Sequence, residues 1–107
     1  MPGQYPDRIK QLTLYDGRFD AYQLDAKLPD NKDCKVLFAS YPVGTVVEPH
    51  QHDTDNYGVI TRGELILTVD GKITRIGVGQ WYHVPAHKEH KAEFERETDE
   101  IEFWFEP

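Results

Sequence analysis

The sequence contains a single cysteine, Cys34, among its 107 residues. One cysteine cannot form a disulfide within the chain, so we expect a reducing, cytoplasmic setting. Long apolar runs are also missing, and none approaches the ~18 residues that a transmembrane helix requires. The first residues lack the basic and apolar regions of a secretory signal, so no such signal is expected.

Positive charge is scarce, with 12 Lys and Arg against 19 Asp and Glu and a formal net charge of −7. A protein that binds nucleic acid through the phosphate backbone needs a basic face, which this balance disfavours. The same balance disfavours binding to an anionic membrane surface. We therefore expect neither nucleic acid nor a membrane as a partner. The length fits one domain over residues 1–107.

Helical patterns are absent as well, and we expect an all-β protein. Seven prolines and eight glycines punctuate short β-prone runs at intervals of roughly ten residues, which is typical of an antiparallel sandwich or barrel. Residues 1–10 are expected to form an irregular arm. Asp16-Gly17 and Asp70-Gly71 are hairpin signals, because Asp-Gly tolerates the positive φ of type I′ turns. The expected strands are 12–15, 19–24, 35–41, 57–62, 64–69, 72–76, 80–84, 90–95 and 100–105.

The last expected strand has two chemically different faces. Ile101, Phe103 and Phe105 share one face, and we expect that face to point into the core. Trp104 lies on the opposite face, where another element or a second subunit would cover it. The acidic residues within 93–102 are expected to lie on a solvated face and turn.

All five histidines fall between residues 50 and 90, at positions His50, His52, His83, His87 and His90. Side chains two apart on a strand point to the same face, so His50 and His52 can converge on one point. Neutral imidazole is the commonest metal ligand in proteins. By itself, however, the pair is better explained as two solvated or half-buried histidines.

Two longer patterns surround these histidines. The first is Gly44-x5-His50-x-His52-x3-Asn56-x6-Gly63, and the second is Gly79-x5-Pro85-x-His87-x2-His90-x3-Phe94. Segments 44–63 and 79–94 resemble the two motifs of the cupin superfamily, Gly-x5-His-x-His-x3,4-Glu-x6-Gly and Gly-x5-Pro-x-Gly-x2-His-x3-Asn. The resemblance implies a single antiparallel jelly-roll β-barrel with a divalent metal inside.

The resemblance also assigns the metal ligands. His50 and His52 match the paired histidines of the first motif, and His90 matches the histidine of the second. Asn56 stands where cupins carry glutamate, and its amide oxygen is the expected fourth ligand. Iron, manganese, nickel, copper and zinc all suit a nitrogen-rich site, so the identity of the one divalent transition metal stays open.

The fourth ligand has two alternatives in the same segment. Continuing strand parity would place Asn56 on the face of the histidines, with Asp53 and Asp55 pointing away. However, Asp53-Thr54-Asp55-Asn56 is turn-forming chemistry, in which parity fails. We favour Asn56 over Asp55, and both over Asp53.

Other side chains are candidates for a substrate pocket, and each also has an ordinary structural role. His87, in a turn near the second motif, could reach a bound substrate or lie on the surface. Arg62 could bind an acidic group or be a surface charge. His83 should point outward or into an interface, since Val84 beside it suits the core. Tyrosines are common packing residues in barrels, and the candidate pocket walls among them are Tyr41, Tyr57 and Tyr82.

Three neutral histidines and an amide would leave the charge of a divalent ion near +2, which attracts anionic or enolisable oxygen ligands. We therefore expect a metal-dependent enzyme acting on a small oxygenated substrate, either a dioxygenase or a non-redox lyase or isomerase. The alternatives are a non-catalytic module that binds a metal or small ligand, and a structural jelly roll. Trp81 and Trp104 on outer faces, together with the family resemblance, favour a homodimer.

Overall fold

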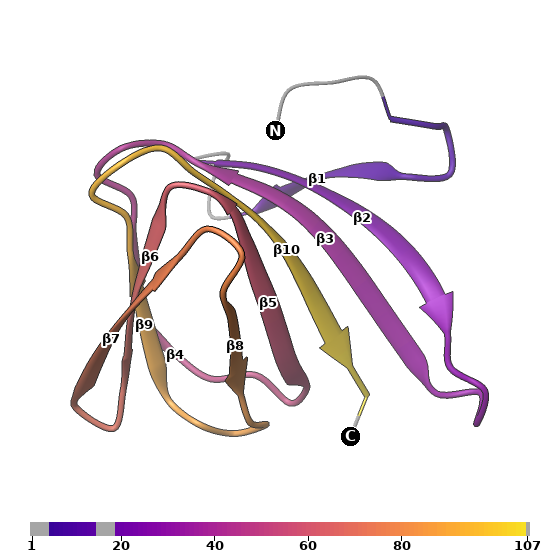
Figure 1. Ribbon diagram of the computed structural model, residues 1–107. Helices are drawn as coiled ribbons and strands as arrows, with labels where there is room; N and C mark the ends of the chain where they lie inside the picture. Colours follow the sequence, from indigo (N-terminus) through magenta and orange to yellow (C-terminus); the bar gives the residue numbers. More distant parts are fainter. Residues whose placement is uncertain (1–4, 15–18, 107) are drawn as a thin grey trace.

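The computed structural model describes residues 5–14 and 19–106, and within these ranges it contains strands but no helix. Ten strands form two antiparallel sheets, with six strands in the order β1-β2-β3-β10-β5-β8 and four in the order β4-β9-β6-β7. In Figure 1, β3, β10 and β5 run side by side, and β6, β7 and β9 lie together to their left. The strands are β1 (Lys10–Leu14), β2 (Phe19–Lys27), β3 (Asp33–Tyr41), β4 (Val46–His50), β5 (Asp55–Arg62), β6 (Glu64–Val69), β7 (Lys72–Gly77), β8 (Trp81–Val84), β9 (His90–Glu93) and β10 (Thr98–Phe105).

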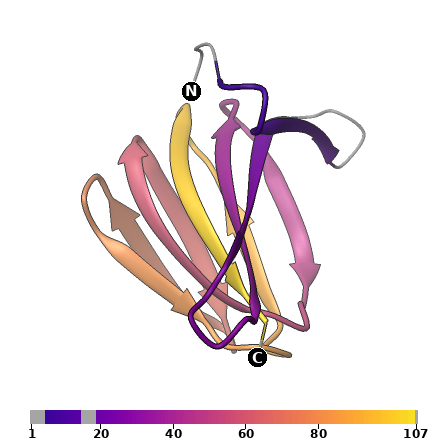
Figure 2. The same cartoon turned by 90° about the vertical axis from the view of Figure 1, so that its right-hand side faces the viewer.

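The prediction of an all-β antiparallel protein is confirmed, but the strands form two sheets rather than one closed barrel. Figure 2 shows the strands of the two layers inclined in a common direction, with the C-terminal end at the bottom. Each expected strand has a counterpart, and β4 is an additional strand that the sequence reading did not list. Strand β4 contains Pro49, and proline is disfavoured inside strands, so the sequence of this segment does not look like a strand. No described helix is long and apolar enough to cross a membrane.

The hydrophobic core lies where the two sheets face each other. Strand β3 alternates from Leu37 to its end, where Leu37, Ala39 and Tyr41 are buried. Alternation of this kind puts every second side chain on the same face of a sheet. Burying one large apolar side chain such as leucine contributes roughly 1.5–3 kcal/mol to the free energy of folding. A few such residues therefore supply much of the stability of the fold. The buried cluster is Ala39, Tyr41, Val47, Ile60, Leu65, Leu67, Ile76, Val84 and Phe94.

The two predicted Asp-Gly hairpins have different outcomes. Asp70 and Gly71 have φ values of 51° and 77° and join β6 to β7, with Val69 and Lys72 as facing partners. This confirms the expected turn, which needs positive φ at both central residues. Asp16-Gly17 lies outside the described residues, although β1 and β2 pair on either side of it as a hairpin would require.

The expected orientation of the last strand is wrong. Glu100 and Glu102 on β10 are 2% and 7% exposed, so these acids are buried between the sheets instead of solvated. The ring of Trp104, on the same side of β10, packs against His52 with the centroids 4.3 Å apart. Phe103 instead stacks on Trp81 at 5.7 Å on the outer face, where Trp81 is 60% exposed. This arrangement of β10 is unusual, because carboxylates are costly to bury without partners.

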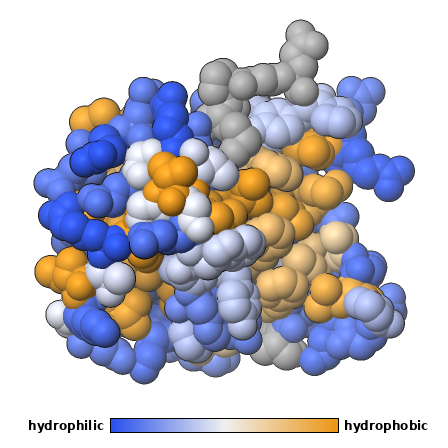
Figure 3. All heavy atoms as spheres, viewed as in Figure 1, coloured by the Kyte–Doolittle hydropathy of each residue, from blue (hydrophilic) through white to orange (hydrophobic). Residues whose placement is uncertain are grey.

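The outer face of the six-stranded sheet is consequently rich in apolar side chains. Figure 3 shows them gathered across the middle of the face turned toward the viewer. Part of this face is hollowed into a groove lined by aromatic and charged side chains. The groove is lined by Leu28, Asp30, Lys32, Asp55, Tyr57, Trp81, Phe103, Phe105 and Glu106.

Candidate metal centre

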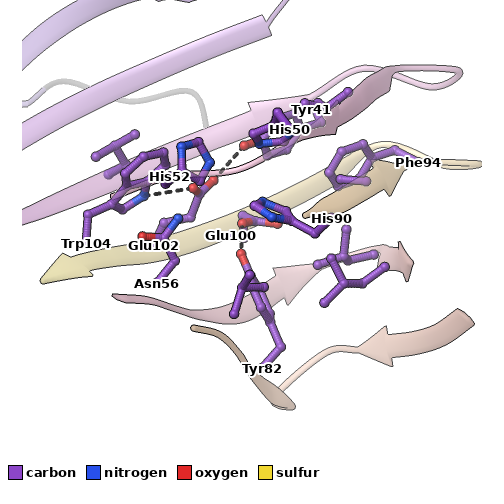
Figure 4. A pocket seen from close by; sticks show the side chains of 16 residues that line it. Tyr41, His50, His52, Asn56, Tyr82, His90, Phe94, Glu100, Glu102 and Trp104 are labelled. Atoms are coloured by element: carbon purple, nitrogen blue, oxygen red, sulfur yellow. Dashed lines mark hydrogen bonds between the residues drawn. The ribbon is translucent and has the colours of Figure 1, made fainter. Parts of the chain in front are cut away.

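Three histidines converge at one end of the space between the sheets. His50 ends β4 and His90 begins β9, and the two residues are facing partners across this ladder. His52 follows two residues after the end of β4. One ligand nitrogen from each of the three rings lies within 4.8 Å of the others. Figure 4 shows the rings on one side of a cavity. The group therefore could hold one metal ion.

Backbone carbonyls orient two of these rings. Nδ1 of His50 lies 2.7 Å from the carbonyl oxygen of Glu48, and Nδ1 of His90 lies 2.9 Å from that of Lys88. A carbonyl only accepts, so in each case Nδ1–H donates and the lone pair is on Nε2. This is the arrangement that fixes the tautomer of histidines that bind metals.

The surroundings of the cluster lower the pKa of two of its histidines, which favours the neutral imidazoles that bind a cation. Burial, followed by repulsion from His50 and His90, lowers the pKa of His52 to about 4. Burial also lowers the pKa of His90, although its bond to the Lys88 carbonyl acts in the opposite direction. Metal binding requires unprotonated imidazole. The donor chemistry of the cluster thus fits a divalent transition metal, without selecting which one.

The structure separates the three candidates for a fourth ligand. Asn56 is buried and lines the same cavity as the histidines, and its Oδ1 accepts a hydrogen bond from Thr54 Oγ1 at 2.6 Å. Asp55 accepts a hydrogen bond from the Ala86 amide at 3.1 Å and belongs to the outer groove. The side chain of Asp53 is 97% exposed. Neither aspartate joins the histidine cluster found in the described part of the chain, so Asn56 stays the expected ligand.

The histidines open into a cavity of about 340 Å³. Its wall combines apolar side chains from both sheets with a few polar groups, which is the usual composition of a small-molecule site. It is lined by Leu37, Tyr41, Val47, His50, His52, Asn56, Leu65, Leu67, Tyr82, Val84, His90, Ala92, Phe94, Glu100, Glu102 and Trp104.

The expected pocket residues divide into two sets. Tyr41 and Tyr82 line the cavity. Tyr57 lies on the outer face, stacked on His83 with the ring centroids 4.2 Å apart. Arg62 forms surface ion pairs, one of them with Glu97 at 3.1 Å. The structure therefore places Tyr57 and Arg62 away from the cavity, and His83 points outward as predicted.

His87 has a backbone role. Its φ is 66°, in the left-handed region, and its amide donates to the carbonyl of His52 at 2.7 Å. The cupin motif has glycine at this place, and glycine adopts such a φ without steric cost. The side chain of His87 is 68% exposed and faces Asp53 at 3.6 Å. His87 thus ties the second motif to the first through its backbone, with its ring outside the cavity.

Glu100 and Glu102 are polar cavity residues that the sequence reading missed. Tyr82 donates its hydroxyl to Oε1 of Glu100 at 2.5 Å, and Tyr41 donates to Oε2 of Glu102 at 2.6 Å. Trp104 Nε1 donates to Oε1 of Glu102 at 3.0 Å. Figure 4 shows these bonds beside the histidines. Glu100 and Glu102 alternate with Trp104 in the sequence, but the sequence analysis expects the two acids on a solvated face and only Trp104 to be covered.

A glycine makes room for one of these contacts. A Cβ atom on Gly58 of β5 would collide with the ring of Tyr82. Gly58 and Tyr82 are facing partners in the β5–β8 pair. The absence of a side chain at Gly58 therefore lets the Tyr82 ring lie over β5 and reach Glu100.

Burial raises the pKa of ionisable side chains in this cavity wall. Burial, and then the charge of Glu102, raises the pKa of Glu100 well above its ordinary value. Burial and both carboxyl groups likewise raise the pKa of Tyr82. Two neighbouring carboxyl groups out of contact with water cannot both ionise cheaply. Burial beside a second carboxyl group thus favours the protonated form of Glu100.

Comparison with known families now identifies the fold. The model of the Cupin_2 family, described as a cupin domain, matches residues 37–104. The chain belongs to this cupin family. The matched region of this cupin contains all three clustered histidines and both buried glutamates. The resemblance inferred from the two motifs is therefore confirmed.

Individual cupins and other relatives add detail. An RmlC-like cupin from Shewanella frigidimarina superposes with a TM-score of 0.79 at 18% identity, over 97% of this chain and 89% of that one. A salicylate 1,2-dioxygenase variant from Pseudoaminobacter salicylatoxidans reaches a TM-score of 0.63 at 17% identity, over 66% and 20%. The H2HPP isomerase of Bacillus subtilis is 37% identical over 71 residues, 64% of this chain but only 30% of that protein's length.

Proposed function

We propose that this cupin is a metal-dependent enzyme acting on a small, oxygenated, anionic substrate, and that it works as a non-redox isomerase or lyase. The observation that carries this proposal is the cavity wall, which holds three convergent imidazoles and, beside them, a buried carboxyl pair. Metal ligands and proton-transfer groups on one wall are what isomerisation or elimination next to a carbonyl requires.

The residues of the chain have distinct roles in this proposal. His50, His52 and His90, with Asn56 or water as a fourth ligand, would hold the divalent ion, which would supply Lewis-acid chemistry to a substrate oxygen. Trp104 packs against His52 and bonds Glu102, which orients both groups. Apolar residues around the histidines keep bulk water away, and this strengthens electrostatic interactions with a bound anion.

The relatives support an enzyme of this kind. The Bacillus subtilis match is named an isomerase, although this chain covers less than a third of it. A dioxygenase is the second candidate, favoured by the donor set itself, because three histidines leave coordination positions open for dioxygen. A non-catalytic binding module is the remaining alternative and would use the same cavity.

One experiment separates these possibilities. Purified protein is analysed for metals and then incubated with a panel of β-diketones, keto acids and phenols, with oxygen uptake and proton NMR followed together. We expect bound metal and substrate rearrangement without oxygen consumption. Oxygen consumption would identify the dioxygenase, and bound metal without turnover of any compound would favour the binding module. The His52→Ala/His90→Ala double variant is the control, and we expect it to be inactive.

We also propose that a second copy of the chain covers the outer groove, giving a homodimer of jelly-roll subunits. The lining of the groove carries both signs of charge, with Lys32 and the acids Asp30, Asp55 and Glu106. In a two-fold interface the same patch meets itself, so Lys32 of each copy can pair with an acid of the other. Cys34, free and buried, supports the proposal of a reducing, cytoplasmic setting.

A further inference from the structure

The two buried glutamates of the cavity do not have equivalent surroundings. Both oxygens of Glu102 accept hydrogen bonds, one from Tyr41 and one from Trp104. Two donors stabilise an ionised carboxylate, so Glu102 is suited to carry the negative charge. Glu100 accepts from Tyr82 through Oε1. Its second oxygen, Oε2, is fully buried and accepts no hydrogen bond from a donor among the residues that the structure describes, while the Glu102 carboxyl group lies within hydrogen-bonding reach of Glu100 and raises its pKa.

A buried carboxyl oxygen that accepts no hydrogen bond is rare in native proteins and calls for an explanation. Glu100 is 2% exposed and lines the cavity into which the three histidines also project. The Glu100 carboxyl group, paired with Glu102, therefore belongs to the wall of the cavity in which a ligand would bind. The position is distinct from the metal-binding donors, because Glu100 comes from β10 whereas His50 and His90 belong to β4 and β9.

We propose that Glu100 is the proton-transfer residue of this cavity, and that its carboxyl group exchanges a proton with a carbon next to a carbonyl group of the substrate. This inference rests on the proposed function and deepens it by naming the reacting group and the class of substrate, a small carbon acid bearing a carboxylate. The high proton affinity of Glu100 beside the charge of Glu102 makes its ionised form a strong carboxylate base.

The step balances without any oxidant. The C–H bond next to the carbonyl breaks, and its proton passes to the carboxylate group of ionised Glu100. The electron pair of that bond forms the C=C bond of an enolate, and the negative charge moves to the carbonyl oxygen. Return of a proton from Glu100 to the same carbon restores the starting compound, and return to a different carbon gives an isomer.

The first test needs no substrate. Infrared spectra of the full chain at neutral pH should show the C=O stretch of a protonated carboxylic acid. We expect this band to disappear in Glu100→Gln and to persist in Glu97→Gln, where the altered residue is an exposed glutamate. Absence of the band in the wild type, or its persistence in Glu100→Gln, would overturn the assignment.

The second test follows the reaction with pyruvate, a small carboxylate whose methyl group is a carbon acid. Zinc-loaded protein in D₂O should exchange the methyl protons of pyruvate for deuterium, as read by NMR. Glu100→Gln keeps the shape of the side chain and an oxygen that can accept from Tyr82, but it cannot transfer a proton. We expect the exchange rate to fall by about 10²–10⁴-fold, while the zinc content is unchanged and Glu97→Gln behaves as wild type.

The outcomes separate this inference from the proposed function. A wild-type chain that takes up no metal would overturn the proposed function. A metal-loaded wild type that exchanges no faster than zinc in buffer, or no faster than Glu100→Gln, would overturn the role of Glu100 alone. Folding of the variant is checked by its metal content and its circular dichroism. If Glu100→Gln does not fold, Tyr82→Phe replaces it and should lower the exchange rate with zinc retained, whereas a wild-type rate would overturn the role.

Discussion

His50 and His90 face each other directly across the β4–β9 ladder, with their ring centroids 4.2 Å apart, although β5 to β8 lie between them in the chain. The pairing brings one histidine from each cupin motif to the same point. His52 completes the group, with its ring 4.5 Å from His50 and 5.1 Å from His90. The geometry of the candidate metal centre is thus a direct consequence of the register between two strands.

Removing two of the three donors should abolish metal binding. We expect one divalent ion per chain in the wild type and less than a tenth of that occupancy in His52→Ala/His90→Ala, because a single imidazole is a weak monodentate ligand. Elemental analysis after dialysis measures this. His83→Ala is the matched control, since His83 is on the outer face, and it should keep full occupancy. Full occupancy in the double variant would refute the ligand assignment.

A carboxylate at position 56 should strengthen metal binding. Asn56→Glu adds a full negative charge beside the cation, whereas Asn56→Ala lets water fill the position, so we expect higher affinity in the first and a smaller change in the second. Competitive chelator titration compares the variants. Asp55→Ala is the control and should leave affinity unchanged. The reverse pattern, with affinity lost only in Asp55→Ala, would show that the wrong residue was aligned with the cupin glutamate.

The metal-free protein should lose stability in mild acid through His52. The pKa of this residue is lowered from 6.5 to about 4 in the folded chain, so the unfolded chain takes up the proton more readily. The free energy of unfolding should therefore fall as pH drops from about 6.5 toward 4. Because His52 is partly exposed, solvent screening reduces the effect. Denaturant unfolding at several pH values in EDTA measures it, and His52→Asn should show a weaker pH dependence than the wild type over this range.

Glu100 should have the opposite effect at higher pH. Its pKa is raised well above the ordinary value of 4.5, so the folded chain holds a proton that the unfolded chain releases. This contribution is fully present below pH 4.5 and is lost as pH rises toward the folded pKa. Glu100→Gln stays neutral at every pH, so its melting temperature relative to wild type should increase from pH 5 to pH 8. A constant difference between the two proteins would contradict a protonated Glu100.

The aromatic groove on the outer face should mediate self-association. Trp81→Lys places a charge on a surface that we propose to be buried between two copies, so it should shift the protein toward the 12.4 kDa monomer. Light scattering across a concentration series at micromolar protein measures the mass. Ile73→Lys is the matched control, because Ile73 is 65% exposed in a different sheet. A wild type that remains monomeric at every concentration would rule out the dimer.

Local patterns in the sequence were sufficient for several features. The Asp70-Gly71 turn follows from the backbone freedom of two neighbouring residues, and the structure has the expected positive φ at both. The antiparallel strands follow from short β-prone runs separated by turns. The spacing of His50, His52 and His90 within two cupin motifs predicted a shared site, and the three rings do converge. These inferences succeeded because each depends on neighbours in the chain or on a motif of known spacing.

The orientation of β10 depended on tertiary structure. Alternation shows that Glu100 and Glu102 share a face, but it does not say whether that face points inward. Buried carboxyl groups are tolerated only when distant parts of the chain supply donors. Here Tyr41 from β3 and Tyr82 from β8 supply them, and Gly58 of β5 leaves space for the Tyr82 ring. The sequence by itself determined every strand except β4, together with the histidine cluster, whereas only the packing of the two sheets decided which residues share the cavity with that cluster.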